Sequence, residues 1–174
     1  GKGQLFLIMA DVVRLVSLRV RMFEAAAEKK NIKLCFSSDK DICITAIDEL
    51  KIEKVIDNLI SNAIKYSHPD AQIDIILICT ESRWTLEVKD YGVGISDNAK
   101  NKLFREFYRG DNAINSKIVG SGIGLLLVKN YVLMHNGQIY LDSKENVGSS
   151  FKIDIPCMQL NESVSPPETL KERL

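Results

Sequence analysis

Two short segments with a period of two, residues 73–77 and 84–88, constrain the fold of this chain more than any other feature. Apolar residues recur at every second position in "IDIIL" and again in "WTLEV", and the turn "TESR" lies between them. This alternation is typical of strands with one buried face, and its repetition across a short turn predicts an antiparallel hairpin. The second strand delivers Asp90 to the start of a glycine-bearing loop.

The rest of the chain changes between helical and strand periodicity. A helix capped by Asp48 carries a broad apolar stripe, and shorter alternating runs surround it. Because helices and strands are segregated, the pattern predicts an α+β fold, a two-layer α/β sandwich with helices on one face of a mixed, mostly antiparallel sheet. In chain order the predicted elements are helix 5–30, strands 33–37 and 41–46, helix 48–66, strands 73–77 and 84–88, helices 97–108 and 122–135, and strands 137–142 and 150–155.

The composition narrows the class of function. The chain of 174 residues has 23 Lys plus Arg and 23 Asp plus Glu, so no overall field favours nucleic acid or an anionic membrane. Its four cysteines form no CxxC pair and lie mostly in apolar runs, which indicates free thiols in a reducing compartment. The longest apolar run, residues 5–10, is far shorter than the roughly 20 residues of a membrane-spanning helix. We expect a cytoplasmic, soluble domain, whose parent protein can be membrane-anchored.

The helix 48–66 has an unusual polar edge. Asn58, Asn62 and Lys65 fall within an arc of roughly 60° beside the apolar stripe. Asparagine is a poor helix former, an amide oxygen is a suitable ligand for Mg²⁺, and a lysine one turn on could reach phosphate oxygens. A solvated polar edge explains the trio equally well, so both interpretations stay open here.

The segment "DYGVGI", residues 90–95, places a carboxylate beside two glycines. Asp90 is an acceptor suited to an adenine amino group, and Gly92 and Gly94 allow backbone conformations that side chains forbid. A tight turn capped by Asp90 explains an isolated DxGxG motif better, because such motifs are common. The nucleotide interpretation therefore depends on the motifs that accompany it.

The segment "GSGIGL", residues 120–125, opens the helix 122–135. Backbone N–H groups at a glycine-rich helix start, with the helix dipole behind them, form an anion site without a basic residue. The spacing GxGxG matches neither the P-loop nor the dinucleotide fingerprint. The alternative is a hinge that leads into a core helix.

The segment "FREFYRG", residues 104–110, precedes that loop. Its aromatic residues can anchor one helix face in the core. Taken alone, the segment is explained by a helix with one buried face and one surface face. Ahead of a glycine-bearing loop, the segment could instead hold a lid whose arginine meets a terminal phosphate.

Taken in order, "DNLISNAIKYS", "DYGVGI", "LFREFYRG", "GSGIGLLLVKNYV" and "GSSF" closely resemble the catalytic ATP-binding domain of sensor histidine kinases, of the GHKL ATPase superfamily. The resemblance covers about residues 45–156. It implies a Bergerat-type sandwich that binds ATP with Mg²⁺ and supplies positioning and electrostatics for phosphoryl transfer.

The resemblance also implies roles for individual residues. Asn62, Lys65 and Arg109 would be catalytic, and Asn62 would coordinate the Mg²⁺ that bridges the phosphates. Asp90 would accept the adenine amino group, and Ser149 or Ser150 could approach the adenine end through water. The implied nucleotide-contacting residues are Asn58, Asn62, Lys65, Tyr66, Asp90, Gly92, Gly94, Ile95, Tyr108, Arg109, Gly120, Gly122, Ile123, Gly124, Leu125 and Ser149.

Three features depart from the family's pattern. Tyr91 replaces a small polar residue, which puts the immediate adenine lining in doubt, and Leu126 and Leu127 are bulkier than usual. Neither His68 nor His135 has the setting of the family's phosphoacceptor, and we expect both at the surface or at a helix end. The acceptor histidine would therefore belong to a separate module.

This assignment divides the chain into a lead-in helix (1–30) from a missing dimerisation and phosphoacceptor module, the ATP-binding domain (31–157) and a C-terminal linker or tail (158–174). The expected partners are the histidine-bearing dimerisation domain of the same parent protein and a response-regulator receiver domain. No nucleic acid and no direct membrane contact are expected. Two other functions remain: a GHKL ATPase clamp, and a nucleotide-sensing docking module without catalysis.

Overall fold

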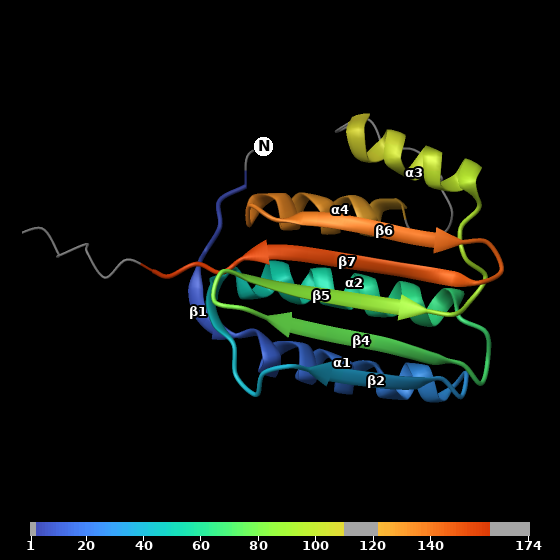
Figure 1. The fold of residues 1–174 in the computed structure, drawn as a ribbon, viewed down its shortest axis with the longest axis horizontal. Coiled ribbons are helices and arrows are strands. Elements are labelled where there is room, and N and C mark those ends of the chain that lie inside the picture. The colour runs from blue at the N-terminus through green and yellow to red at the C-terminus, as the bar shows by residue number, and fades with distance from the viewer. Residues whose placement is uncertain (1–2, 110–121, 161–174) are drawn as a thin grey trace, which may run out of the picture.

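The computed structural model describes residues 3–109 and 122–160, which form two layers (Figure 1). A five-stranded sheet in the order β2-β4-β5-β7-β6 makes one layer, and helices α1, α2 and α4 cover one of its faces. In chain order the elements are β1 (Ile8–Asp11), α1 (Val12–Glu28), β2 (Lys33–Ser38), β3 (Ile44–Ile47), α2 (Glu49–Tyr66), β4 (Gln72–Cys79), β5 (Arg83–Asp90), α3 (Asp97–Arg109), α4 (Gly122–Met134), β6 (Gln138–Lys144) and β7 (Gly148–Pro156).

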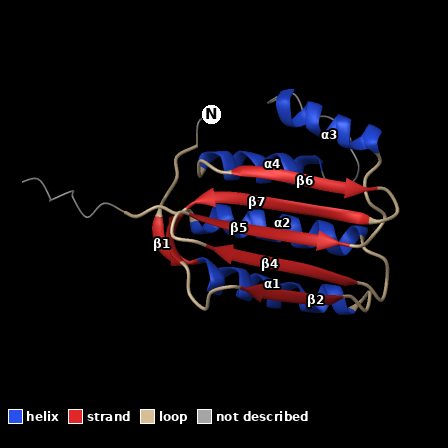
Figure 2. Cartoon of the chain, in the orientation of Figure 1, coloured by secondary structure: helices blue, strands red, loops and turns tan. Residues whose placement is uncertain are grey.

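The sheet is mixed and mostly antiparallel (Figure 2). β4 and β5 form the predicted hairpin, β7 pairs with both β5 and β6 in antiparallel orientation, and β2 runs parallel to β4. The prediction of an α+β two-layer sandwich is therefore confirmed.

The core lies between the sheet and the helices. Trp84 and Leu86 of β5 are fully buried, as are Ile52, Ile56 and Ile60 on the inner stripe of α2. Each such aliphatic side chain contributes about 1.5–3 kcal/mol relative to an exposed one. This packing fixes the inner face of α2, and with it the Asn62 position, against β5.

The chain start differs from the predicted helix 5–30. Residues Ile8–Asp11 form β1, which pairs with β3, and the helix begins only at Val12. Asp11 ends the strand and caps the helix, because its Oδ1 accepts from the backbone N–H groups of Val13 at 3.1 Å and Cys43 at 3.0 Å. Helical spacing of apolar residues does not reveal such a short preceding strand.

The predicted strand 41–46 is found as β3, which begins three residues later and ends one residue later than expected. It belongs to the small β1-β3 sheet, whereas β2 joins the main sheet. The predicted helix 48–66 is confirmed as α2, and Asp48 is its N-cap, accepting from the Lys51 N–H at 3.2 Å.

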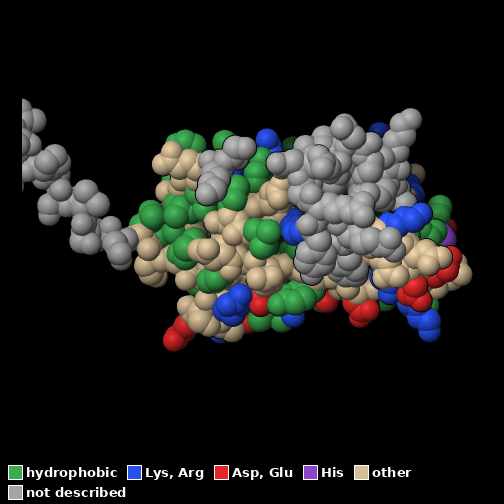
Figure 3. Space-filling model, turned by 90° about the horizontal axis from the view of Figure 1, so that it is seen from above, with side chains coloured by type: hydrophobic (Ala, Val, Ile, Leu, Met, Phe, Trp, Pro, Cys, Tyr) green, Lys and Arg blue, Asp and Glu red, His purple; other side chains and the backbone are tan. Residues whose placement is uncertain are grey.

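Helix α1 packs against α2 and contributes Val12 and Val16 to the same core. Assigning residues 1–30 to a lead-in from another module stays a prediction. None of the helices within residues 3–109 and 122–160 has the length and apolar character needed to cross a bilayer. Figure 3 shows apolar side chains gathered at the end of the molecule where β1 lies. Phe6, which precedes β1, and Ile44, which pairs with Asp11 of β1, are exposed.

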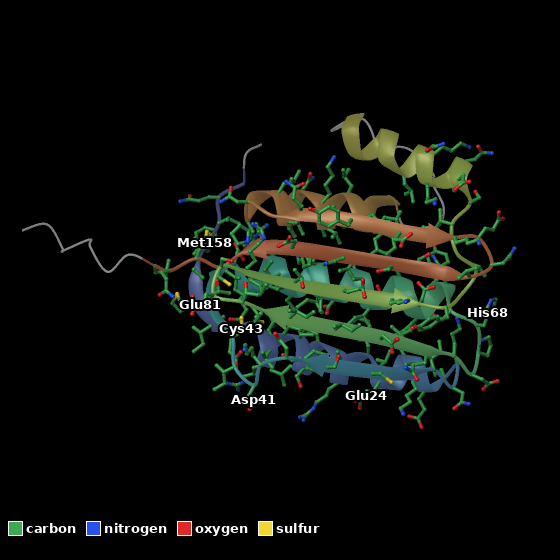
Figure 4. The ribbon with its side chains drawn as sticks, in the orientation of Figure 1. Glu24, Asp41, Cys43, His68, Glu81 and Met158 are labelled. Carbon is green, nitrogen blue, oxygen red and sulfur yellow. The ribbon has the colours of Figure 1, made fainter. Side chains whose placement is uncertain are left out.

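The cysteines at this end are packed thiols. Cys43, Cys79 and Cys157 line one hollow near Met158 (Figure 4), and the thiols are free. Burial raises the thiol pKa of both Cys79 and Cys157, which disfavours the reactive thiolate. They therefore behave as small hydrophobic residues, as the sequence indicated.

Candidate nucleotide-binding site

A buried pocket of about 120 Å³ lies where β5 ends and the C-terminal half of α2 packs on the sheet. Its walls are mostly apolar, with a few convergent polar groups, as in small-molecule sites. It is lined by Asn62, Ala63, Tyr66, Asp90, Val93, Gly94, Ile95, Ala99, Leu103, Leu125, Ser149 and Phe151.

A larger groove of about 370 Å³ lies on the outer face of the sheet, between β5, β7 and β6. Its lining includes charged side chains such as Glu87, Lys89 and Lys152, and it is open to solvent. The buried pocket is the better candidate site, because it combines enclosure, apolar walls and a buried carboxylate.

Asp90 is the polar centre of the pocket. It is 5% exposed, and burial is the main reason that its carboxyl pKa is raised, against the lowering effect of two backbone hydrogen bonds. Within the described residues both bonds fall on Oδ1, from Gly92 N at 3.0 Å and Ser149 N at 3.3 Å. Oδ2 is therefore the oxygen available to a ligand donor.

Close packing explains why glycine occupies positions 92 and 94 after Asp90. A Cβ on Gly92 would lie 2.1 Å from the Tyr66 carbonyl oxygen, and one on Gly94 would lie 2.0 Å from the Lys144 carbonyl oxygen. Gly94 also has a φ of +67°, which disfavours any side chain. The glycines thus hold the loop 91–96 between α2 and the β6–β7 turn, where it forms one wall of the pocket.

Helix α2 supplies the opposite wall. Asn62, 8% exposed, and the half-buried Tyr66 line the pocket one turn apart. Asn58 is not part of the lining, and its amide donates to the Lys54 carbonyl at 2.8 Å. Lys65 is exposed, with its ammonium group 5.5 Å from the centre of the Tyr66 ring.

The phosphate side of the predicted site is described only in part. Tyr108 and Arg109 end α3, but their side chains lie outside the described part of the structure, and Gly120 lies outside the described residues altogether. Gly122 and Ile123 begin α4, Gly124 follows them, and Leu125 lines the pocket.

Two residues considered for the adenine end, Tyr91 and Ser150, have side chains outside the pocket. Tyr91 does not line the pocket: its hydroxyl donates to Asp74 at 2.7 Å, and Lys89 lies over its ring on the outer face of the sheet. Ser150 also faces outward, donating to Glu87 at 2.9 Å, whereas Ser149 lines the pocket. Of the two serines, Ser149 is therefore the one that lies in this pocket, and the approach of either serine to an adenine stays a prediction.

The two histidines, His68 and His135, differ in burial. His68 is exposed at the end of the molecule where β5 ends (Figures 1 and 4). His135 directly follows α4, so it lies at a helix end, one of the two positions expected for it, but it is fully buried. Its Nε2 accepts from Asp48 N at 3.0 Å and its Nδ1 lies 2.7 Å from the Tyr131 carbonyl, so both ring nitrogens are engaged.

The sequence interpretation missed several lining residues and one buried hydroxyl. Val93 and Phe151 belong to quoted motifs, and Phe151 shares the inner face of β7 with Ser149 by the period of two. Ala99 and Leu103 come from α3, one turn apart. Ser143, which touches both the loop 91–96 and Ser149, had no local signal.

The residues present fit an adenine nucleotide. An adenine amino group is a donor that suits the available Asp90 Oδ2, and the apolar walls suit a flat ring. In the described residues, no cluster of three or more His, Cys, Asp or Glu side chains could hold a metal ion. A divalent cation here would need the Asn62 amide oxygen together with oxygens of the ligand.

The fold and the pocket define an ATP-binding domain of the Bergerat type. The chain belongs to the family of histidine kinase-, DNA gyrase B-, and HSP90-like ATPases, which matches residues 47–159. Membership in this family implies that the chain uses ATP, and the resemblance of the sequence to histidine kinase ATP-binding domains is confirmed.

Among curated proteins, the sensor protein kinase WalK of Staphylococcus saprophyticus is 41% identical over 120 residues. The match covers 68% of this chain and 20% of WalK, so the chain spans about a fifth of the length of that relative. The catalytic domain of histidine kinase ThkA superposes with a TM-score of 0.76 at 26% identity, covering 89% of this chain and all of that domain.

A further solved structure shows ThkA in complex with the response regulator protein TrrA. It matches with a TM-score of 0.69 at 22% identity, over 87% of this chain and 42% of that one. At this identity the likeness shows the fold alone.

Proposed function

We propose that this chain is the ATP-binding catalytic domain of a sensor histidine kinase. It binds Mg-ATP and donates the γ-phosphoryl group to a histidine on a separate dimerisation domain, in a two-component phosphorelay. The observation that carries the proposal is the buried pocket that brings the Asp90 carboxylate and the Asn62 amide together between β5 and α2. The likeness to WalK directs this ATP site toward histidine phosphorylation.

The adenine end is formed by Asp90, Ser149 and the apolar walls. Asp90 Oδ2 accepts the adenine amino group, while its Oδ1 is held by the Gly92 and Ser149 backbone. Ile95, Leu125 and Phe151 enclose the ring and exclude water, which strengthens the hydrogen bond to the carboxylate.

The phosphate end is formed by α2, the end of α3 and the start of α4. Asn62 would hold Mg²⁺ through its amide oxygen, and the bound ion would neutralise phosphate charge. Lys65 and Arg109 contribute positive charge, and the N-terminus of α4 offers backbone N–H groups to the phosphates.

The phosphoacceptor comes from another segment of the parent protein. His135 is fully buried with both ring nitrogens hydrogen-bonded, so it cannot attack a phosphoryl group. His68 lacks the sequence setting of an acceptor. The partners we propose are a histidine-bearing dimerisation domain and a receiver domain, which the two-component role proposed from the likeness to WalK requires.

An ATPase clamp is less well supported. Such proteins usually carry a glutamate base near the metal asparagine, and the described lining of the pocket contains Asp90 as its acidic residue. The acidic residues in the middle of α2 face α1 instead: Glu53 lies 3.0 Å from Arg19, and Asp57 pairs with the same guanidinium at 2.7 Å.

Phosphoryl transfer in trans tests this proposal. The chain is incubated with γ-labelled ATP, Mg²⁺ and a separately expressed dimerisation hairpin of a sensor kinase, and acid-labile label on the hairpin is measured. We expect labelling with the parent chain and with the control Ser61→Ala, an exposed residue of α2, and none with Asn62→Ala. ATP hydrolysis by the chain without labelling of any hairpin would favour the clamp instead.

A further inference from the structure

The Ser143 hydroxyl, at the end of β6, lies at the centre of a buried hydrogen-bond network beside the pocket. Ser143 is 5% exposed. Its Oγ accepts from Ile95 N at 2.8 Å, donates to the Gly148 carbonyl oxygen at 3.0 Å, and lies 2.8 Å from Ser149 Oγ. The network joins the loop 91–96 to both sides of the β6–β7 turn.

The direction of the Ser143–Ser149 bond follows from counting protons. A hydroxyl has one proton and two lone pairs. The Gly148 carbonyl can only accept, so the Ser143 proton is used there, and Ile95 N–H occupies one lone pair. The second lone pair therefore receives the proton of Ser149 Oγ, and Ser149 keeps only lone pairs for a ligand in the pocket.

Ser149 lies beside the carboxylate of the same site. Its backbone N–H donates to Asp90 Oδ1 at 3.3 Å, the two residues are cross-strand partners, and both line the pocket. The pocket thus offers two neighbouring acceptors, a carboxylate and a hydroxyl oxygen whose proton is held elsewhere. A ligand amino group satisfies this arrangement, whereas a ligand carbonyl would face two acceptors.

We propose that Ser143 is a positioning residue that determines specificity: it fixes Ser149 as an acceptor, so that the pocket selects a 6-aminopurine over a 6-oxopurine. This inference rests on the proposed ATP site. Without the Ser143 hydroxyl, the Ser149 proton becomes free to turn toward a ligand oxygen. Since one hydrogen bond of this kind changes affinity by about 3- to 10-fold, discrimination should fall by that factor.

Calorimetric titration with ADP and inosine diphosphate tests the proposal, because inosine has a carbonyl at position 6 and a proton on the neighbouring N1, where adenine has an amino group and a bare N1. The variant is Ser143→Ala, and the matched control is Ser150→Ala, which removes a hydroxyl from the outer face of the same strand. We expect the ratio of the Kd for inosine diphosphate to that for ADP to fall about 3- to 10-fold in Ser143→Ala and to stay within about 2-fold in the control. Ser143→Thr, which retains a hydroxyl, should restore the ratio.

Equal weakening of both ligands in Ser143→Ala, with an unchanged ratio, overturns this inference alone, because a merely structural residue would behave in that way. If Ser143→Ala fails to fold by circular dichroism, Ser143→Cys replaces it, since a thiol keeps a similar size but accepts hydrogen bonds weakly. An unchanged ratio in that variant likewise overturns the inference. A parent chain that binds neither ligand overturns the proposed ATP site, and the inference with it.

Discussion

Acidification should destabilise this fold because it protonates the buried His135, and the variant His135→Gln tests this prediction. The imidazole of His135 joins the end of α4 to the start of α2, because Nε2 accepts the backbone N–H of the helix cap Asp48 at 3.0 Å. Nδ1 must then carry the proton, which it donates to the Tyr131 carbonyl at 2.7 Å. Protonation of Nε2 would remove an acceptor from a buried N–H group.

The sign of the effect follows from the direction of the pKa shift. Burial, the largest cause, lowers the pKa of His135 in the folded state. A histidine with a lowered folded pKa contributes stability that is fully present above its unfolded pKa and is lost as the pH falls toward the folded value. With an unfolded pKa of about 6.5, lowering the pH to about 5.5 removes roughly 1 kcal/mol.

The assay is urea denaturation at pH 7.5 and 5.5. We expect the free energy of unfolding of the parent to fall by about 1 kcal/mol more than that of His135→Gln, whose amide keeps an acceptor but does not titrate. His68→Gln, at an exposed position, is the matched control. An identical pH dependence for the parent and His135→Gln would refute the argument that burial holds His135 neutral.

Three further predictions concern α2 and the pocket. Lys30 Nζ donates to the carbonyls of Ile64 and Ser67 at the C-terminus of α2, at 2.8 Å each. Lys30→Met should therefore lower the free energy of unfolding by about 1–2 kcal/mol in urea titrations. The control Lys29→Met should lower it by much less. Gly94→Ala should lower both the melting temperature and the affinity for ADP, since its Cβ would collide with the Lys144 carbonyl; an unchanged melting temperature would contradict the packing role. Affinity for ADP should decrease as the pH falls through the raised pKa of Asp90, because a ligand amino group favours the ionised carboxylate. The decrease should be up to about tenfold per pH unit. In the same calorimetric series, Asp90→Asn should bind ADP weakly at every pH.

Local periodicity was enough to predict most of this fold. The hairpin of β4 and β5, the helix α2 with its Asp48 cap, and the order of the later elements all follow from patterns that a few neighbouring residues determine. The strand β1 was missed because its four residues continue the apolar spacing of the helix α1, which follows directly in the chain. The parallel pairing of β2 with β4 depends on contacts across about forty residues of chain, which no local pattern reports.

The candidate site likewise contains residues that local motifs predict and residues that only the folded chain brings together. Asn62, Asp90 and Ser149 were named from motifs, and the structure brings them together in one pocket. Tyr91 was placed in doubt, although the alternation of a strand already turns the residue after a buried Asp90 to the outer face. Ser143 could not be found locally, because its role arises from three elements that meet only in the folded chain.

The most direct test of the central claim is calorimetric titration of ADP and a non-hydrolysable ATP analogue, with and without Mg²⁺. The parent chain, Asn62→Ala and Asp90→Ala are compared. The account predicts that the parent binds both nucleotides, that Asn62→Ala loses the Mg²⁺-dependent part of the affinity, and that Asp90→Ala loses the part that depends on adenine. A parent chain that binds no nucleotide under any of these conditions would contradict the account.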